Sequence, residues 1–184
     1  MKIFKISVCF ILCALMLTSC GNSKNAEYFK ELISDNATEE VMYLPKLLSG
    51  YDNPDEITVT AQKDTVTYLF RSSVESKNNL VYQYINVHLQ MHADSQDIEK
   101  SIDSVIDNFA DENSTVKAVK HEFDGKKYAI SHEIRPDLDI VRLTVIFAVS
   151  DNVSAFYTLE IKDIEEINDK ILDDICEDTE MIKL

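Results

Sequence analysis

IVRLTVIFAVSDNVSAFYTLEIK, residues 140–162, predicts a β-hairpin whose register decides which side chains face the core. A two-residue loop would mix apolar and polar side chains on each face, because one residue of slip exchanges the faces. A three-residue loop, Ser150-Asp151-Asn152, keeps the apolar side chains together, and Asn152 tolerates the left-handed backbone that its bulge position needs. The expected pairs are Phe147 with Ala155, Val145 with Tyr157, Leu143 with Leu159 and Val141 with Ile161. The reverse face then pairs Arg142 with Glu160, Thr144 with Thr158 and Ile146 with Phe156.

Two further hairpins are expected earlier in the chain. Asp124-Gly125, the strongest short hairpin signal in the sequence, turns residues 116–134 so that Val119 lies opposite Ile130. A two-residue turn at Lys63-Asp64 sets Val59 opposite Tyr68. Apolar and polar residues alternate in both segments, which predicts strands with one buried face.

The longest clean alternation runs from Leu80 to His92 and predicts a long strand. Its apolar face carries Val81, Ile85, Val87, Leu89 and Met91. Its polar face carries Tyr82, Tyr84, Asn86, His88, Gln90 and His92. Amphipathic rings beside amides favour a binding surface, so this polar face is the candidate binding face. The alternative is a strand face that a helix covers or that solvent partly wets.

Four helices complete the pattern. Apolar residues at helical spacing predict a helix over residues 26–33, and a second short helix is expected over residues 38–48, kinked or broken by Pro45. A third helix is expected over residues 95–109, where the apolar residues form one stripe and an N-cap residue stands at the beginning. Asp163, with a glutamate three residues later, forms a capping box that is expected to open the last helix, followed by a frayed acidic tail.

This order of elements predicts an α+β domain over residues 26–184. Its antiparallel sheet would have about six to seven strands packed with helices, and two short helices would precede it. At the level of element order, the chain is similar to the Mog1/PsbP-like sandwich, a fold that also occurs in bacterial envelope lipoproteins. A fold alone does not assign a function.

The first twenty residues have the order of a secretory signal. Lys2 and Lys5 precede an apolar run at residues 6–17, which is too short to span a bilayer. The run ends in Leu17-Thr18-Ser19-Cys20, which resembles the lipobox of bacterial lipoproteins: a leucine, two small residues and a cysteine. The resemblance implies cleavage before Cys20 and a diacylglycerol thioether on its sulfur, usually with a third acyl chain on the new amino terminus. An ordinary secretory signal, in which Cys20 is incidental, is the alternative.

This resemblance sets the expected location of the protein. Residues 1–19 would be a signal peptide and residues 20–25 a lipidated tether, since two or more acyl chains anchor a protein stably in a membrane. Gly21 is not the aspartate that signals inner-membrane retention in enteric bacteria. The expected location is therefore the bacterial cell envelope, at the outer membrane facing the periplasm.

The charge of the chain excludes some partners. The formal charge of −15 becomes −17 once the signal, with two lysines and no acid, is removed. Nucleic acid is excluded because its recognition needs a cationic surface, and a polybasic attachment to lipid is excluded on the same ground. With Cys9 and Cys13 in the signal and Cys20 lipidated, Cys176 is left alone, so no internal disulfide is expected. Neighbouring acids disfavour its thiolate, and we expect a structural thiol.

The sequence offers little catalytic chemistry. Three glycines are too few for a serine-hydrolase elbow, a phosphate-binding loop or a dinucleotide fingerprint, so no cofactor is expected. His88 and His92 would lie about 13 Å apart on one strand, too far to share a metal ion. His121 and His132 are similarly separated along their hairpin, and no metal site is expected. Pairs across strands, such as His88 with His121, stay open.

Two short segments resemble the Asp-Ser/Thr-aliphatic acceptor of periplasmic O-glycosylation in Bacteroidetes. They are Asp64-Thr65-Val66 and Asp103-Ser104-Val105, which makes Thr65 and Ser104 candidate acceptors. Thr65 lies beside an expected turn, whereas Ser104 lies within an expected helix.

These observations favour a non-enzymatic envelope lipoprotein. We expect a binding or interaction module, anchored through Cys20, that presents one face to a protein partner or a small ligand. The alternative is an envelope hydrolase whose histidine and carboxylates are assembled from separate strands.

Overall fold

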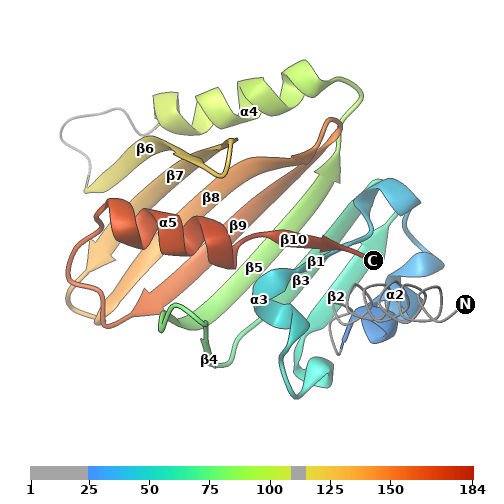
Figure 1. The fold of residues 1–184 in the computed structure, drawn as a ribbon, viewed down its shortest axis with the longest axis horizontal. Coiled ribbons are helices and arrows are strands. Elements are labelled where there is room, and N and C mark those ends of the chain that lie inside the picture. The colour runs from blue at the N-terminus through green and yellow to red at the C-terminus, as the bar shows by residue number, and fades with distance from the viewer. Residues whose placement is uncertain (1–24, 109–114) are drawn as a thin grey trace, which may run out of the picture.

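The computed structural model describes residues 25–108 and 115–184 and has an α+β fold, as expected (Figure 1). Its main sheet is antiparallel, with eight strands in the order β2-β3-β5-β9-β8-β7-β6, and β4 pairs with one end of β5. The strands are β2 (Thr58–Gln62), β3 (Thr65–Phe70), β4 (Val74–Glu75), β5 (Val81–Met91), β6 (Val116–Phe123), β7 (Lys126–Arg135), β8 (Ile140–Ser150) and β9 (Val153–Lys162). A separate pair consists of β1 (Tyr43–Pro45) and β10 (Met181–Lys183).

Helices cover the two faces of the sheet unequally. One face packs against α2 (Ala26–Ser34), α3 (Lys46–Ser49), α5 (Asp169–Asp178) and the β1–β10 pair, and this side holds the main hydrophobic core. In Figure 1, α5 lies across the near side of the sheet. On the other face, α4 (Ser95–Asn108) contacts β6 to β9, and its Ile98 is buried, as are Ala129 and Ile146 of the sheet. Short 3-10 helices, Glu39–Val41 and Pro54–Glu56, complete the connections.

The registers predicted for the three hairpins are confirmed. Val59 pairs with Tyr68, Val119 with Ile130, and Val145 with Tyr157. Asp124 and Gly125 both have positive φ, 48° and 71°, which is the geometry of the favoured tight hairpin turn. The predicted loop of the third hairpin is wrong, however. Ser150 pairs with Val153, so the turn has two residues, and a register shift beside Val149 restores the apolar face.

The predicted faces of β5 are wrong at its beginning. A register shift places Tyr82 opposite Ile161 and Tyr84 opposite Glu160, with Gln83 as the extra residue. Tyr82 is therefore fully buried in the core, although a strict alternation puts it on the polar face. From Tyr84 onward the predicted alternation holds.

The second N-terminal helix and the frayed tail were also predicted wrongly. Residues 38–48 do not form one helix: Glu39–Val41 form a 3-10 helix, residues 43–45 form β1, and Lys46–Ser49 form α3, with the break at Pro45 as expected. The last residues form β10, where Leu44 pairs with Ile182. Neither strand has a local signal, since each is stabilised by a partner more than 130 residues away in the chain.

The last helix begins later than the capping box predicts. Asp163 has a positive φ of 57° and lies outside any helix. The N-cap residue is Asn168, whose side-chain oxygen accepts a hydrogen bond from the Ile171 backbone at 3.1 Å. The cap is thus an asparagine in extended conformation, five residues after the predicted one.

Replacing Asn168 with alanine is expected to lower the free energy of unfolding by about 1 kcal/mol, because the first turn of α5 loses its capping acceptor. Urea unfolding followed by circular dichroism measures the change. The exposed Glu166, the partner in the predicted capping box, serves as the control. Glu166→Ala should stay within about 0.5 kcal/mol of the parent, and a larger loss than for Asn168→Ala would contradict this assignment.

Candidate functional site

In the described part of the chain, no helix covers the face of the sheet opposite the main core over β3, β5 and the adjoining side of β9. We call this surface the open face and define it by the side chains that point away from the core there: Thr65, Thr67, Leu69, Tyr84, Asn86, His88, Gln90, His92, Ser154, Phe156 and Thr158. Among the described helices, α4 covers only the neighbouring part of this face, over β6 to β8 and the adjoining side of β9. Five of the six residues of the predicted candidate binding face therefore lie together, and Tyr82 does not.

Cross-strand pairing builds the open face in rows. Thr67, His88 and Phe156 form one row, and the Thr67 hydroxyl lies 3.0 Å from His88 Nδ1. Asn86 and Thr158 are paired in the next row. Phe156 is 39% exposed and lies beside His88, so a phenyl ring stands among hydroxyl, amide and imidazole groups. Apart from Leu69 and Phe156, alternate residues of three strands thus form a polar surface.

Two further contacts hold the side chains of this surface in place. The His92 Nε2 atom lies 2.8 Å from the hydroxyl of the buried Ser154, and the Gln90 amide donates to the backbone carbonyl of Met91. In contrast, the side-chain oxygen of Asn86 lies below the surface without a hydrogen-bond partner among the described residues. An unpaired buried amide oxygen is unfavourable, and such groups are uncommon in folded proteins.

Charge is depleted on the open face. From the row of Gln90 and Ser154 to the row of Asn86 and Thr158, β3, β5 and β9 present no acidic or basic side chain on this side. Charged residues begin at its border, where Glu160 accepts from Arg142 at 2.8 Å. The whole chain carries 28% charged residues, whereas these rows of β3, β5 and β9 carry none.

Sequence reasoning missed the contribution of Phe156, Thr67 and Thr158 to this surface. The hairpin register places Phe156 and Thr158 on the side of their strand that is opposite the core. The missing information was that β9 is the neighbour of β5, because that pairing joins segments about 70 residues apart.

No protein-family model, curated protein or solved structure matches this chain. The similarity in element order to the Mog1/PsbP-like sandwich and the lipobox resemblance therefore stay predictions.

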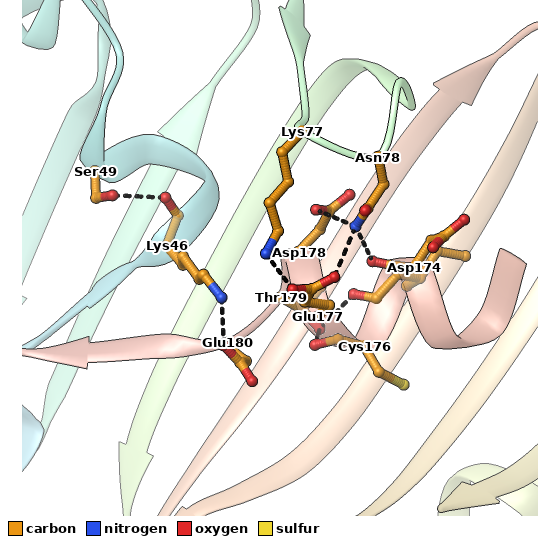
Figure 2. Close-up of polar contacts among 11 residues, drawn as sticks. Lys46, Ser49, Lys77, Asn78, Asp174, Cys176, Glu177, Asp178, Thr179 and Glu180 are labelled. Carbon is orange, nitrogen blue, oxygen red and sulfur yellow. Dashed lines mark hydrogen bonds and ion pairs between the residues drawn. The ribbon is translucent and has the colours of Figure 1, made fainter. Parts of the chain in front are cut away.

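A second polar cluster lies where the turn after β4 meets the C-terminal end of α5 (Figure 2). Asp178 is 4% exposed, and it accepts hydrogen bonds from the Tyr82 hydroxyl at 2.9 Å and the Asn78 amide at 3.1 Å. Burial raises the pKa of the Asp178 carboxyl above its ordinary value. Lys77 pairs with Glu177 in the same cluster. These contacts tie the turn to the helix, which is a structural role.

A pocket of about 370 Å³ opens beside this cluster, lined in part by Lys46, Tyr51, Ser76, Lys77 and Asp178. Its two lysines already pair with glutamates, since Lys46 Nζ lies 2.6 Å from Glu180. The carboxylate of Asp178 has donors on both oxygens. The pocket therefore offers few unoccupied polar groups for a ligand.

The histidines do not assemble a catalytic or metal site in the described part of the chain. His88 and His121 lie on opposite faces, and three strands separate β5 from β6. His121 Nε2 instead lies 2.7 Å from Asp173 of α5, a carboxylate that is 52% exposed. No group of three or more His, Cys, Asp or Glu side chains that could hold a metal occurs among the described residues.

The remaining sites differ in accessibility. Cys176 is buried, and burial raises the pKa of its thiol to about 12, which makes it a poor nucleophile. Thr65 is half-buried at the first position of β3, and Ser104 is exposed on α4. Cys20 lies outside the described residues. No described helix is long and apolar enough to cross a bilayer.

His132 provides a pH-dependent contribution to stability. Its side chain is 9% exposed, and burial, with a smaller effect of Lys117 on the facing strand, lowers its pKa. The unfolded chain then binds the proton more tightly than the folded chain. The free energy of unfolding should therefore fall as the pH is lowered through the ordinary imidazole range, near 6.5. Well above that range, the group has no such effect.

His132→Leu should remove this part of the pH dependence. Urea unfolding at several pH values between about 5 and 7.5, which span the ordinary imidazole pKa, measures it for both proteins. The loss of stability on acidification is expected to be smaller in the variant than in the parent. Identical pH profiles would show that His132 titrates equally in the folded and unfolded chains.

Proposed function

We propose that this protein is a non-enzymatic binding module of the bacterial cell envelope, anchored through a lipid on Cys20, that binds its ligand on the open face. The observation that carries the proposal is the neutrality of the open face in a strongly acidic chain. Depletion of charge with retention of aromatic and amide groups is the composition of binding surfaces rather than of ordinary solvated strands.

The start of the described chain is consistent with a short tether. Asn25 is 3% exposed, and its amide donates to the backbone carbonyl of Tyr51 at 2.7 Å. The fold therefore holds the chain from Asn25 onward. Five residues separate this point from Cys20, a span of at most about 17 Å. A lipid on Cys20 would keep the domain next to the membrane surface.

The hydrolase alternative has two observations in its favour: His121 contacts Asp173, and it lines a pocket of about 480 Å³. Such a pair can orient a general base, but a hydrolase also needs a nucleophile or an activated water beside the histidine. Among the described residues, no hydroxyl or thiol is hydrogen-bonded to His121. The contact is better explained as a surface pair that joins α5 to β6.

Hydroxyl-radical footprinting with mass spectrometry tests the binding function. Oxidation of Tyr84 and Phe156 is compared between the purified, lipidated protein and the same protein in native cell envelopes. We expect both residues to be protected in the envelope. Leu138, which is 54% exposed in the turn between β7 and β8, is the control and should react equally in both samples. Equal oxidation of Tyr84 and Phe156 in both samples would contradict the proposal.

The anchor is tested by Cys20→Ser. The parent protein should sediment with membranes and resist extraction by high salt and carbonate, because its attachment depends on acyl chains. The variant is expected in the soluble fraction, and mass spectrometry of the parent should detect a lipid-modified amino terminus at residue 20. A variant that stays with membranes as fully as the parent would rule out lipid anchoring at this position.

A further inference from the structure

The open face shares the charge depletion of protein interfaces, but it lacks the large apolar centre of a stable one. Interfaces between proteins have apolar cores, and most of their binding energy comes from a few large buried side chains. Phe156 is the one exposed large apolar side chain that the described open face carries. The buried Ile146 of β8 pairs with it on one side and the half-buried Leu69 lies in the next row, but the other side chains around it are Thr, Asn, His and Gln, which offer hydrogen bonds rather than apolar contact area.

The lack of charged side chains on the open face narrows the class of ligand further. A cationic partner would find no carboxylate on the rows between Gln90 and Asn86, and an anionic partner would find no lysine or arginine there. The acidic remainder of the chain would also repel a polyanion. A neutral ligand with many hydroxyl groups matches this surface best.

The geometry of the rows suits such a ligand. Neighbouring strands lie about 4.8 Å apart, and alternate residues along a strand repeat at about 6.8 Å, so donors and acceptors recur on a regular grid. Tyr84 and Phe156 add aromatic rings on neighbouring strands, four pairing positions apart, which is about 13 Å along the strands. A sugar ring has an apolar C–H face that can pack on an aromatic ring and a rim of hydroxyls that can reach neighbouring amides and hydroxyls. The Asn86 oxygen, for which residues 25–108 and 115–184 supply no hydrogen-bond partner, would gain a donor if its amide turned toward the ligand.

We infer that the open face binds a neutral polysaccharide, with Phe156 and Tyr84 as stacking positions and with Asn86, His88 and Thr158 as hydrogen-bonding positions. This inference rests on the proposed function and names its ligand class. A ligand that extends along the rows would contact several strands at once, which lets many weak contacts contribute together.

Native affinity electrophoresis of the lipidated protein in detergent tests the inference. The probes are soluble dextran, glycogen, galactomannan and arabinoxylan as neutral polysaccharides, with polygalacturonate as the anionic control. We expect at least one neutral polysaccharide to slow migration, and polygalacturonate to have no effect. Phe156→Ala should weaken that binding about tenfold, as for the loss of a central aromatic contact, and Tyr84→Ala should weaken it as well. Leu138→Ala, far from the open face in the turn after β7, should bind like the parent.

Three results would overturn the inference: no retardation by any neutral probe, retardation by polygalacturonate alone, or neutral binding that survives the double substitution of Tyr84 and Phe156. The footprinting experiment separates this failure from failure of the proposed function. Protection of Tyr84 and Phe156 in native envelopes without polysaccharide binding would leave a binding module with a different ligand. Circular dichroism and urea unfolding of each variant confirm that lost binding is not lost folding.

Discussion

Asp178→Ala is expected to lower the free energy of unfolding by about 2–3 kcal/mol, because the buried Tyr82 hydroxyl loses its acceptor and the half-buried Asn78 amide loses one of its acceptors. The Tyr82 hydroxyl and the Asn78 amide both donate to this carboxylate, and the Tyr82 side chain is fully buried. A hydrogen bond to a charged group contributes about 1.5–3 kcal/mol, and a buried donor left unpaired is costly. The turn after β4 would also lose one of its attachments to α5, while the contacts of Lys77 and Asn78 with Glu177 would remain. Urea unfolding at neutral pH measures the loss.

Two matched variants test whether the loss of stability comes from the buried hydrogen bonds of Asp178. Asp173, on the same helix, has a carboxylate that is 52% exposed, so Asp173→Ala should change stability by only about 0.5 kcal/mol, as for a surface pair. Tyr82→Phe removes one donor and keeps the ring. In a double-mutant cycle, the double variant should be less destabilised than the sum of the two single variants. Additive losses would mean that the hydrogen bond between Tyr82 and Asp178 contributes nothing.

Phe147→Ala is expected to cost about 3–5 kcal/mol, because it opens a cavity in the middle of the main core. Phe147 is 1% exposed and packs between the rings of Tyr128 and Tyr157, at centroid distances of 4.8 and 6.1 Å. All three side chains point toward α5 and the other elements of the main core. Chemical unfolding of the purified variant measures the loss of stability. If the parent protein is only marginally stable, the variant would be largely unfolded at 37 °C.

Phe156→Ala is the matched control for this prediction. Phe156 lies in the partner strand of the same hairpin, but on the opposite face, where it is 39% exposed. Its removal should change the free energy of unfolding by less than about 1 kcal/mol. Comparing the two variants thus separates effects on stability from effects on binding, because Phe147 packs in the core and Phe156 is proposed to contact the ligand. Equal destabilisation by both substitutions would contradict the assignment of faces.

The candidate site was only partly predictable. Alternation correctly grouped Tyr84, Asn86, His88, Gln90 and His92 on one side of β5. It failed at Tyr82, because an extra residue at Gln83 turns that side chain into the core. The reason is tertiary: the Tyr82 hydroxyl reaches Asp178 in a helix that is almost one hundred residues away.

The helices were also only partly predictable from the sequence. The stripe of α4 was predictable, and an Asp94 oxygen accepts from the Gln96 backbone at its beginning. The capping box at Asp163 was not a helix start, because the residues before Asn168 pack as an irregular segment. Local capping signals compete with tertiary packing, and here packing prevails.

The amino-acid pattern alone was sufficient to predict the registers of the three hairpins. Their strands are adjacent in the chain, and with a short turn and a side-chain period of two residues, one register buries the apolar face. Packing between distant segments decided the rest: the adjacency of β5 and β9 that completes the open face, the pairing of β1 with β10, and the inward turn of Tyr82. These contacts have no local sequence signature, because each depends on a partner that only the folded chain brings near. Their stabilising free energy is gained only after long loops have closed.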